Sequence, residues 1–379
     1  MAISHRCWAE VDLGALRENL AWIRHRVGPR VKIMTVVKAD AYGHGLKQIA
    51  ALLMQSGTDI FGVANLVEAH AIRTVGRGWP VLMLGACLPD EVEWAVRDDV
   101  TPTISSLDEA RRFSSVALHL KKTVPVHLKV DTGMGRLGIA AEAAPDLFRQ
   151  IEQMPAIRIQ GIYTHYASAE DDAAFSRQQR EQFRRLLKPL LKKSKLEFIH
   201  ANNSGALLFE RASIYNTVRP GLLVYGILPP GKRRASAALR KHLGTALSWK
   251  CRVSLVKEIS KGAPLSYGRT FVAPRKMRVA TLTVGYGDGY LRSGSNRAQV
   301  LIRGHLCPVL GRITMDQMIV DVSHLPAVTV GDEVVMIGSQ GAAQISVTQL
   351  AEWCGTIPWE VLTNITYRVP RLYRGGQAS

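Results

Sequence analysis

The sequence predicts an α/β protein: a closed (β/α)8 barrel of the TIM type, followed by a second, mostly β domain. Strand and helix patterns alternate without a break from residue 31 to residue 228, which gives eight units over roughly the 200 residues that a closed barrel requires. From residue 246 onward the pattern changes to short alternating strands. A chain of 379 residues also exceeds what a single hydrophobic core usually organises.

The eight predicted barrel strands share an apolar and β-branched composition. They are 31–37, 60–64, 81–84, 100–104, 124–130, 157–163, 198–201 and 215–218. Helices are predicted at 16–27, 46–54, 67–75, 91–96, 107–120, 143–151, 175–191 and 206–209. An open, doubly wound sheet is the alternative, but it usually carries a Gly-x-Gly-x-x-Gly loop after its first strand, and none follows residue 37. The closed barrel is therefore the preferred prediction.

The second domain is predicted from strands at 247–259, 277–284, 299–302, 317–322 and 333–337. Pro229-Pro230-Gly231-Lys232-Arg233-Arg234 precedes it and has the composition of a linker.

Composition excludes several classes of protein. With 47% hydrophobic and 21% charged residues, the chain is globular rather than disordered. It has no signal-peptide pattern and no run of about 18 apolar residues, so we expect a cytoplasmic protein with no membrane partner. Its five cysteines form no Cys-x-x-Cys pair, so neither a metal site nor a disulfide framework is indicated. The net charge of +18 is dispersed along helices without interleaved aromatics, which favours a solvated face over nucleic-acid binding.

Lys38 is the first candidate functional residue. It directly follows a buried strand, where desolvation would lower its pKa and make the amine a nucleophile able to form an imine with an aldehyde. A lysine at a strand end is more often a solvated surface residue. However, Arg136, His165, Ser204 and Arg219 also follow predicted strands. Since a barrel places its chemistry at the carboxyl ends of its strands, these five residues should meet at one mouth.

The motif Lys38-Ala39-Asp40-Ala41-Tyr42-Gly43-His44-Gly45 resembles the cofactor-lysine signature of the alanine racemases, which use pyridoxal 5′-phosphate. Further motifs of that family recur in order over nearly the whole chain. They are 127–138, 216–221, 265–268, 285–290, 311–317 and 364–371. The resemblance implies a barrel domain at 14–228 and a β-rich domain formed by 1–13 with 240–379.

By this resemblance, Lys38 and Tyr267 are the two catalytic bases. Racemisation removes the α-proton from one face and returns it on the other, so two bases are needed; Lys38, which also holds the cofactor as an imine, serves one face and Tyr267 the other. A tyrosine between Ser and Gly is as often an ordinary loop residue, so the motif carries this assignment. His165 is the candidate neighbour that would lower the pKa of Tyr267.

The resemblance also implies the cofactor site. Arg219 matches the arginine that faces the pyridine nitrogen and keeps it unprotonated, which favours reprotonation of the α-carbon over transamination. Asn203 and Ser204 precede a short helix, an arrangement suited to a phosphate but equally to an ordinary helix cap. The residues assigned to the cofactor are Lys38, Tyr42, His165, Asn203, Ser204, Arg219, Gly221 and Tyr367.

Four further residues have roles by resemblance. Arg136 would pair with the substrate carboxylate, and the backbone of Met315 would also contact the substrate. Lys129 matches a lysine that is carbamylated in several family members. Tyr286 matches the substrate gate, although Gly287 stands where many relatives carry alanine.

The sequence therefore predicts an alanine racemase that interconverts L- and D-alanine for peptidoglycan. The family also implies a head-to-tail homodimer in which Tyr267 and the Met315 segment complete the site of the partner chain. Two alternatives stay open at this point: a serine or broad-spectrum amino-acid racemase on the same scaffold, and a non-catalytic pyridoxal phosphate carrier. A carrier would lack the second domain and Tyr267.

Overall fold

The computed structural model describes residues 5–192, 194–210, 215–236, 239 and 241–375. These residues divide into two compact units. The barrel unit comprises Leu16–Ala41 and Gly45–Gly244. The β unit comprises Met1–Ala15, Tyr42–His44 and Thr245–Ser379.

The barrel unit holds eight parallel strands that close on themselves. The strand order is β5-β4-β3-β2-β10-β9-β8-β6, and β5 also pairs with β6, so the sheet has no free edge between them. The prediction of a closed barrel is confirmed, and the alternative of an open, doubly wound sheet is excluded. The strands are β2 (Lys32–Val36), β3 (Ile60–Val63), β4 (Val81–Met83), β5 (Thr101–Ile104), β6 (Val124–Asp131), β8 (Ile157–Tyr163), β9 (Phe198–His200) and β10 (Thr217–Val218).

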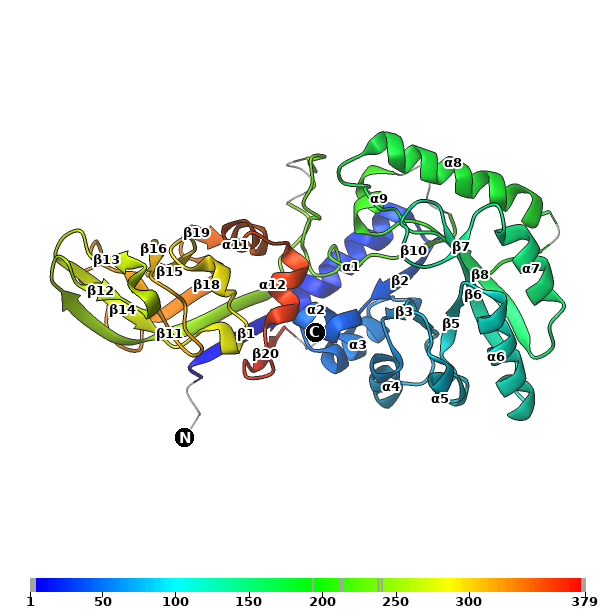
Figure 1. The fold of residues 1–379 in the computed structure, drawn as a ribbon, viewed down its shortest axis with the longest axis horizontal. Helices are drawn as coiled ribbons and strands as arrows, with labels where there is room; N and C mark the ends of the chain where they lie inside the picture. The colour runs from blue at the N-terminus through cyan, green and yellow to red at the C-terminus, as the bar shows by residue number, and fades with distance from the viewer. Residues whose placement is uncertain (1–4, 193, 211–214, 237–238, 240, 376–379) are drawn as a thin grey trace. The chain divides into compact units, whose positions relative to one another are not determined.

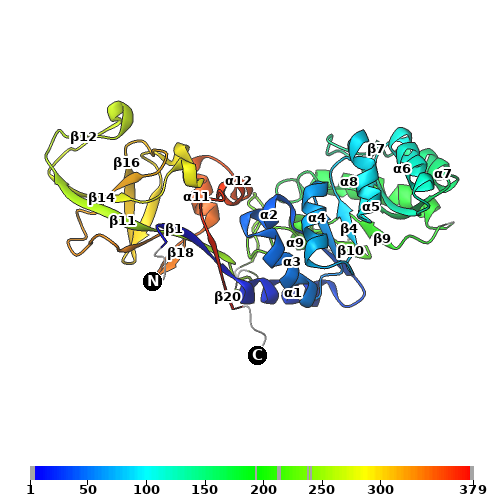
Figure 2. The same ribbon diagram turned by 90° about the horizontal axis from the view of Figure 1, so that it is seen from below.

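The helices lie around the outside of these strands (Figures 1 and 2). They are α1 (Leu13–Val27), α3 (Leu46–Gln55), α4 (Leu66–Val75), η1 (Pro89–Glu91), α5 (Val92–Arg97), α6 (Leu107–His119), α7 (Ala144–Glu152), α8 (Ala173–Leu190) and α9 (Ser204–Phe209). The short strand β7 (Ile139–Ala140) pairs with β6. Inside the barrel, Met34, Ile60, Leu82 and Phe198 come from four different strands and form one buried apolar cluster. This core fixes the strand ends that carry the site.

The segment after β2 forms a short turn with an unusual backbone conformation. Lys38–Gly43 forms one short helical segment, α2. Its residues Ala39, Asp40, Ala41 and Tyr42 all have φ between 52° and 54°, which is the left-handed region. This conformation costs about 1–2 kcal/mol for each L-residue. It is held by a long-range hydrogen bond, Ala39 N donating to Glu68 Oε1 at 2.6 Å, and by a local one, Leu46 N donating to Asp40 Oδ1 at 2.7 Å.

The β unit contains a second closed barrel within its described residues. Six antiparallel strands pair in the order β11-β14-β17-β16-β15-β18, and β18 returns to β11. They are β11 (Leu247–Ile259), β14 (Met277–Leu282), β15 (Gln299–Ile302), β16 (His305–Leu310), β17 (Met318–Asp321) and β18 (Glu333–Gln340). The long β11 also pairs with β1 (Cys7–Asp12), which in turn pairs with β20 (Arg371–Arg374). β19 (Ala343–Ile345) flanks β18.

Several elements of the β unit were not predicted. They are β16, β19, α11 (Val347–Cys354), α12 (Pro358–Asn364), β20, the hairpin β12 (Pro264–Leu265) and β13 (Phe271–Val272), and the 3-10 turns η3 (Tyr267–Arg269), η4 (Tyr286–Asp288) and η5 (Arg292–Gly294). Residues 42–44 group with this unit because Arg371 Nε donates to the Gly43 carbonyl at 3.0 Å and the Tyr373 hydroxyl donates to the His44 carbonyl at 3.0 Å.

Residues 229–234, which the composition suggested as a linker, group with the barrel unit. Arg233 N donates to the Glu170 carbonyl at 2.8 Å, and the Arg233 guanidinium pairs with the buried Glu210 carboxylate at 2.7 Å. A proline- and glycine-rich composition predicts a turn, and here the Arg233–Glu210 ion pair holds that turn against the barrel.

None of the helices in the described residues is long and apolar enough to cross a membrane. The five cysteines are buried as free thiols. Within the same residues, no cluster of three or more His, Cys, Asp or Glu side chains could hold a metal ion.

Candidate active site

Five of the predicted site residues follow the carboxyl ends of barrel strands. Lys38 follows β2, Arg136 follows β6, His165 follows β8, Ser204 follows β9 and Arg219 follows β10. The parallel strands of a closed barrel all end at the same face. The closed barrel therefore places these five positions at one face, and their roles stay predictions.

Lys38 is half-buried at the first position of the left-handed turn. Burial lowers the pKa of its amine, and the nearby positive charge of Arg136 lowers it further, while the Glu68 carboxylate acts in the opposite direction. A lower pKa raises the fraction of neutral amine at neutral pH. Because the neutral amine is the nucleophile, the lowered pKa increases the reactivity of Lys38 toward an aldehyde.

Arg219 is the buried cation of the site, with only 3% of its surface exposed. Its Nη1 donates to His200 Nδ1 at 2.6 Å, and its Nη2 donates to the Thr164 and Ala201 carbonyls at 2.8 and 3.0 Å and to His165 Nδ1 at 3.2 Å. Burial lowers the pKa of the guanidinium to about 10, so it stays charged at neutral pH. A guanidinium cannot accept a hydrogen bond, so both histidines must present an unprotonated nitrogen to it.

A chain of histidines extends from Arg219 into the barrel. His200 accepts from Arg219 through Nδ1, so neutral His200 carries its proton on Nε2, which lies 3.0 Å from His127 Nδ1. His127 must then carry its own proton on Nε2. The position opposite is Gly161, where a Cβ would lie 2.8 Å from the His127 ring, so only glycine leaves room for this imidazole. Neither His127 nor His200 was assigned a role from the sequence, although both lie within predicted strands, 124–130 and 198–201.

His127 should make the protein sensitive to acid. Burial, with the charge of Arg219 second, lowers the pKa of His127 to about 3, against about 6.5 in an unfolded chain. Between these values the unfolded chain binds a proton that the folded chain does not, so stability falls as pH falls through this window and is unaffected above it. In His127→Leu, the dependence of the unfolding free energy on pH should be less steep by about 1.4 kcal/mol per pH unit between about pH 4 and 6.

Urea unfolding across that pH range measures the slope. Phe198→Leu is the matched control, because the Phe198 ring packs against His127 at 5.2 Å but does not titrate. That control should lower stability by a similar amount at every pH. If the unfolding free energy of His127→Leu depended on pH as steeply as that of the wild type, the pKa of His127 could not be lowered in the folded protein.

One carboxylate, that of Asp131, holds the backbone of the loop that carries Arg136. Asp131 at the end of β6 accepts from the backbone N–H groups of Gly133, Met134 and Gly135 at 2.8 to 3.2 Å. Gly133-Met134-Gly135-Arg136-Leu137-Gly138 has the glycine spacing of a dinucleotide loop, but it leads into β7 rather than into a helix. The loop therefore presents the exposed Arg136 side chain instead of a phosphate cradle.

Lys129 is buried on β6, with its Nζ 4.3 Å from the centre of the Tyr163 ring. Burial lowers the pKa of its amine well below the usual value, and the charges of Arg219 and Arg136 act in the same direction. Among the described residues no carboxylate forms an ion pair with Lys129. Burial and the two arginines therefore all favour the neutral form of this amine.

The Ser204 and Gly221 segment forms a small cluster of donors. Ser204 Oγ accepts from Gly221 N at 2.9 Å and from Leu223 N at 3.4 Å. Asn203 instead caps α9, because its Oδ1 accepts from Ala206 N at 2.9 Å. The structure thus shows the helix-cap role for the Asn203 side chain, and Ser204 with Gly221 remains the candidate anion site.

The other predicted site residues belong to the β unit. Tyr42 is buried, whereas Tyr367 is 97% exposed and Tyr267 is 71% exposed. Tyr286 and Met315 are also exposed and lie side by side, since Gly287 N donates to the Met315 carbonyl at 2.8 Å and Tyr286 N donates to the Thr314 carbonyl at 3.0 Å.

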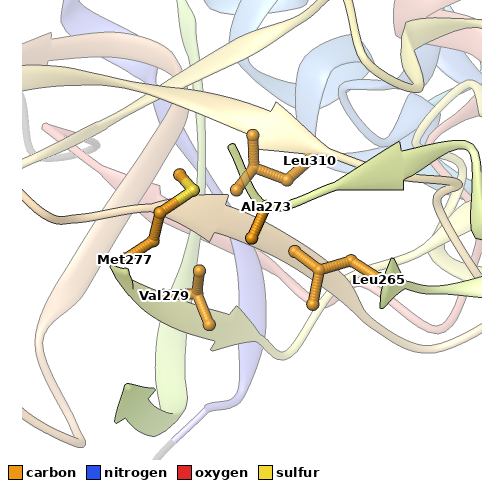
Figure 3. Packing of buried hydrophobic residues seen from close by; sticks show 5 residues of the cluster. All are labelled: Leu265, Ala273, Met277, Val279 and Leu310. Atoms are coloured by element: carbon orange, nitrogen blue, oxygen red, sulfur yellow. The ribbon is translucent and has the colours of Figure 1, made fainter. Parts of the chain in front are cut away.

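Tyr267 stands at the tip of the β12–β13 hairpin. Leu265 and Ala273 anchor the two arms of this hairpin by packing against Met277, Val279 and Leu310 (Figure 3). Ser266 Oγ also donates to the Arg312 carbonyl at 2.5 Å. A hollow of about 660 Å³ lies beside the tyrosine. It is lined by Ser254, Leu255, Lys257, Ser266, Tyr267, Thr281, Arg312, Thr314, Gln317, Met318 and Ile319.

Comparison with known proteins identifies the family. Residues 11–229 match the family described as alanine racemase, N-terminal domain, and residues 246–373 match alanine racemase, C-terminal domain. The match to the second domain excludes the single-domain carrier. The chain is 39% identical over 374 residues to the alanine racemase of Halothermothrix orenii, covering 98% of each chain. It is 41% identical to that of Methylacidiphilum infernorum, covering 97% of this chain and 93% of the relative.

Solved structures agree. The alanine racemase of Clostridium difficile 630 superposes with a TM-score of 0.91 at 31% identity, covering 98% of this chain and 96% of that one. The alanine racemase of Bacillus anthracis with bound L-Ala-P gives a TM-score of 0.89 at 32% identity, covering 100% and 97%. The chain therefore belongs to the alanine racemase family and is a racemase, an enzyme of the isomerase class.

Proposed function

We propose that this enzyme interconverts L- and D-alanine with pyridoxal 5′-phosphate as its cofactor, and that it supplies D-alanine for peptidoglycan in the cytoplasm. The observation that carries the proposal is the pairing, at one barrel mouth, of a lysine of lowered pKa with a buried arginine held between neutral histidines. Membership of the family supports the choice of alanine.

The residues present fit pyridoxal phosphate. Lys38, whose pKa is lowered by burial, suits its aldehyde, and the Ser204 hydroxyl, whose oxygen accepts from Gly221 N at 2.9 Å, can donate its proton to the phosphate. When bound, the cofactor supplies the electron sink that makes the α-proton of an amino acid acidic. Tyr42 and Tyr367 are proposed to complete the phosphate site.

Arg219 is proposed to determine the type of reaction. It can donate a hydrogen bond to a pyridine nitrogen but cannot pass a proton to it at neutral pH. Its described partners are carbonyl oxygens and the unprotonated nitrogens of His165 and His200, so no acid is available there to protonate the ring. With Arg219 at this position, a bound pyridine ring would stay unprotonated, and this would favour return of the proton to the α-carbon over transamination.

Arg136 is proposed to hold the substrate carboxylate, and Lys129 to become carbamylated. The neutral Lys129 amine attacks carbon dioxide, a nitrogen–carbon bond forms, one carbon–oxygen π pair moves to oxygen, and the amine proton leaves to solvent. The product is an anion that offsets the charges of Arg136 and Arg219, which otherwise lie near a buried amine. Carbon-13 NMR with labelled bicarbonate tests this step: a carbamate signal should be present in the wild type and absent in Lys129→Ala.

The assembly is proposed to be a head-to-tail homodimer with shared sites. Tyr267, Met315 and Tyr286 are exposed on the β unit, so all three are open to a second copy of the chain. The domain limits proposed from the sequence, 14–228 for the barrel and 1–13 with 240–379 for the β domain, stay a prediction. The absence of a nucleic-acid partner also stays a prediction.

A chirality-resolved assay on purified protein tests the function. With pyridoxal phosphate added, the protein should convert either enantiomer of alanine to an equal mixture, and should act much more slowly on serine and other amino acids. It should also show the visible absorbance of a lysine-bound cofactor, and Lys38→Ala should lose it. Equal rates across the panel would favour a broad-spectrum racemase, and no turnover of any amino acid would contradict the proposal.

A further inference from the structure

Gln179 connects two loops of the site through three hydrogen bonds. It lies on α8 and is completely buried, with 0% of its surface exposed. Its Oε1 accepts from Ala167 N at 3.0 Å. Its Nε2 donates to the His165 carbonyl at 3.1 Å and to Thr132 Oγ1 at 3.3 Å. Every polar atom of the side chain is thus used, and each bond reaches outside α8.

The two loops carry different parts of the candidate site. Thr132 lies between Asp131, which organises the Arg136 loop, and the glycines of that loop. His165 and Ala167 belong to the loop after β8, which also carries the Thr164 carbonyl that accepts from Arg219. The two loops also meet directly, because Thr132 Oγ1 and Thr164 Oγ1 are 2.7 Å apart.

A second residue on the same face of α8 contacts the Arg136 loop. Phe175 is one helical turn before Gln179, and a Cβ at Gly133 would lie 2.7 Å from Phe175 Cζ. Gly133 also has φ of +123°, so a side chain there would be strained as well as crowded. The face of α8 formed by Phe175 and Gln179 therefore sets how close the Arg136 loop can come.

The chemistry of the position requires an amide. Ala167 N needs an acceptor, while the His165 carbonyl needs a donor, and a glutamine side chain offers both at one length. A glutamate would place a second acceptor against the His165 carbonyl, and a methionine would offer neither group. Either change leaves buried backbone groups without a partner, which is unfavourable unless the loops move to reach water.

We propose that Gln179 is a positioning residue that fixes the Arg136 loop against the His165 loop, and through Arg136 sets the affinity for the substrate carboxylate. The inference rests on the proposed function for the identity of the substrate. A glutamine that served only the stability of the barrel would instead lower the unfolding temperature and leave substrate affinity and loop order unchanged.

The test uses Gln179→Glu and Gln179→Met, with Gln178→Met as the matched control, because Gln178 is the preceding residue of α8 and is exposed. For both Gln179 variants, KM for each enantiomer of alanine should rise about tenfold, in line with the loss of one buried hydrogen-bonded pair, while kcat changes by no more than about threefold. The Gln178→Met enzyme should match the wild type in both constants.

A second readout is independent of activity. Trypsin cleavage after Arg136, identified by peptide mass, should be several times faster in the Gln179 variants than in the wild type or Gln178→Met. Thr132→Val removes one of the three bonds together with the direct Thr132–Thr164 contact and should shift KM and cleavage in the same direction, which keeps the test valid if the Gln179 variants fail to fold.

An unchanged KM together with unchanged cleavage after Arg136, whatever the unfolding temperature, would overturn the positioning role. If the protein proves to racemise no amino acid, the cleavage measurement still decides whether Gln179 orders the loop. Failure of the proposed function and failure of this inference are therefore distinguishable.

Discussion

Tyr267→Phe is expected to slow exchange of the α-proton of L-alanine by about 100- to 10,000-fold, the range for loss of a positioned general base. Exchange from D-alanine should stay within about tenfold of the wild type. The reason is that Tyr267 is proposed to serve one face of the substrate and Lys38 the other. A phenylalanine keeps the aromatic ring, so the β12–β13 hairpin should be undisturbed.

Deuterium incorporation at the α-carbon in heavy water, measured separately from each enantiomer, gives both rates. The D-alanine reaction is the internal control for folding and cofactor binding. Thermal unfolding of the variant should match the wild type, because the Tyr267 side chain is 71% exposed and its hydroxyl stabilises nothing in the described chain. Equal loss from both enantiomers would contradict the assignment of one base to each face.

The barrel could be predicted because each of its strands is recognisable from its own short stretch of sequence. Buried parallel strands form continuous apolar runs, and Ile157–Tyr163 was predicted with the limits that the structure shows. The ends of helices were less well predicted. α8 begins at Ala173 rather than at Phe175, because Asp172 Oδ1 accepts from Phe175 N and so caps the helix two residues earlier.

The left-handed turn after Lys38 could not be predicted from the motif. Small residues and glycines indicate a turn, but Ala39 and Ala41 have no intrinsic preference for positive φ. The conformation depends on Glu68, which lies 29 residues further along the chain and accepts from Ala39 N. A tertiary contact of this kind leaves no local signal.

The supporting residues of the site were missed for the same reason. His127 and His200 are 73 residues apart, and Gln179 and Thr132 are 47 residues apart. Each pair is created by the barrel, which brings distant strand ends and loops together. Residues in family motifs could be assigned, whereas residues that hold those side chains in place required the structure.

Mixing Lys38→Ala chains with Tyr267→Ala chains is expected to restore activity that neither variant has alone. In a dimer with shared sites, Lys38 of one chain and Tyr267 of the other form each site. A mixed dimer then has one site with both lesions and one with neither. Random exchange of equal amounts makes about half of all dimers mixed, so the mixture should reach about one quarter of wild-type activity per chain.

The matched control places both lesions on one chain and mixes it with the wild type. If sites are shared, every site of a mixed dimer lacks either Lys38 or Tyr267, so wild-type chains diluted in this way lose about half of their activity. If each chain completes its own site, the wild-type chains keep all of it. Differently tagged chains that co-purify establish that mixed dimers have formed. Should they form while the first mixture stays inactive and the second loses nothing, each barrel must use the Tyr267 of its own chain.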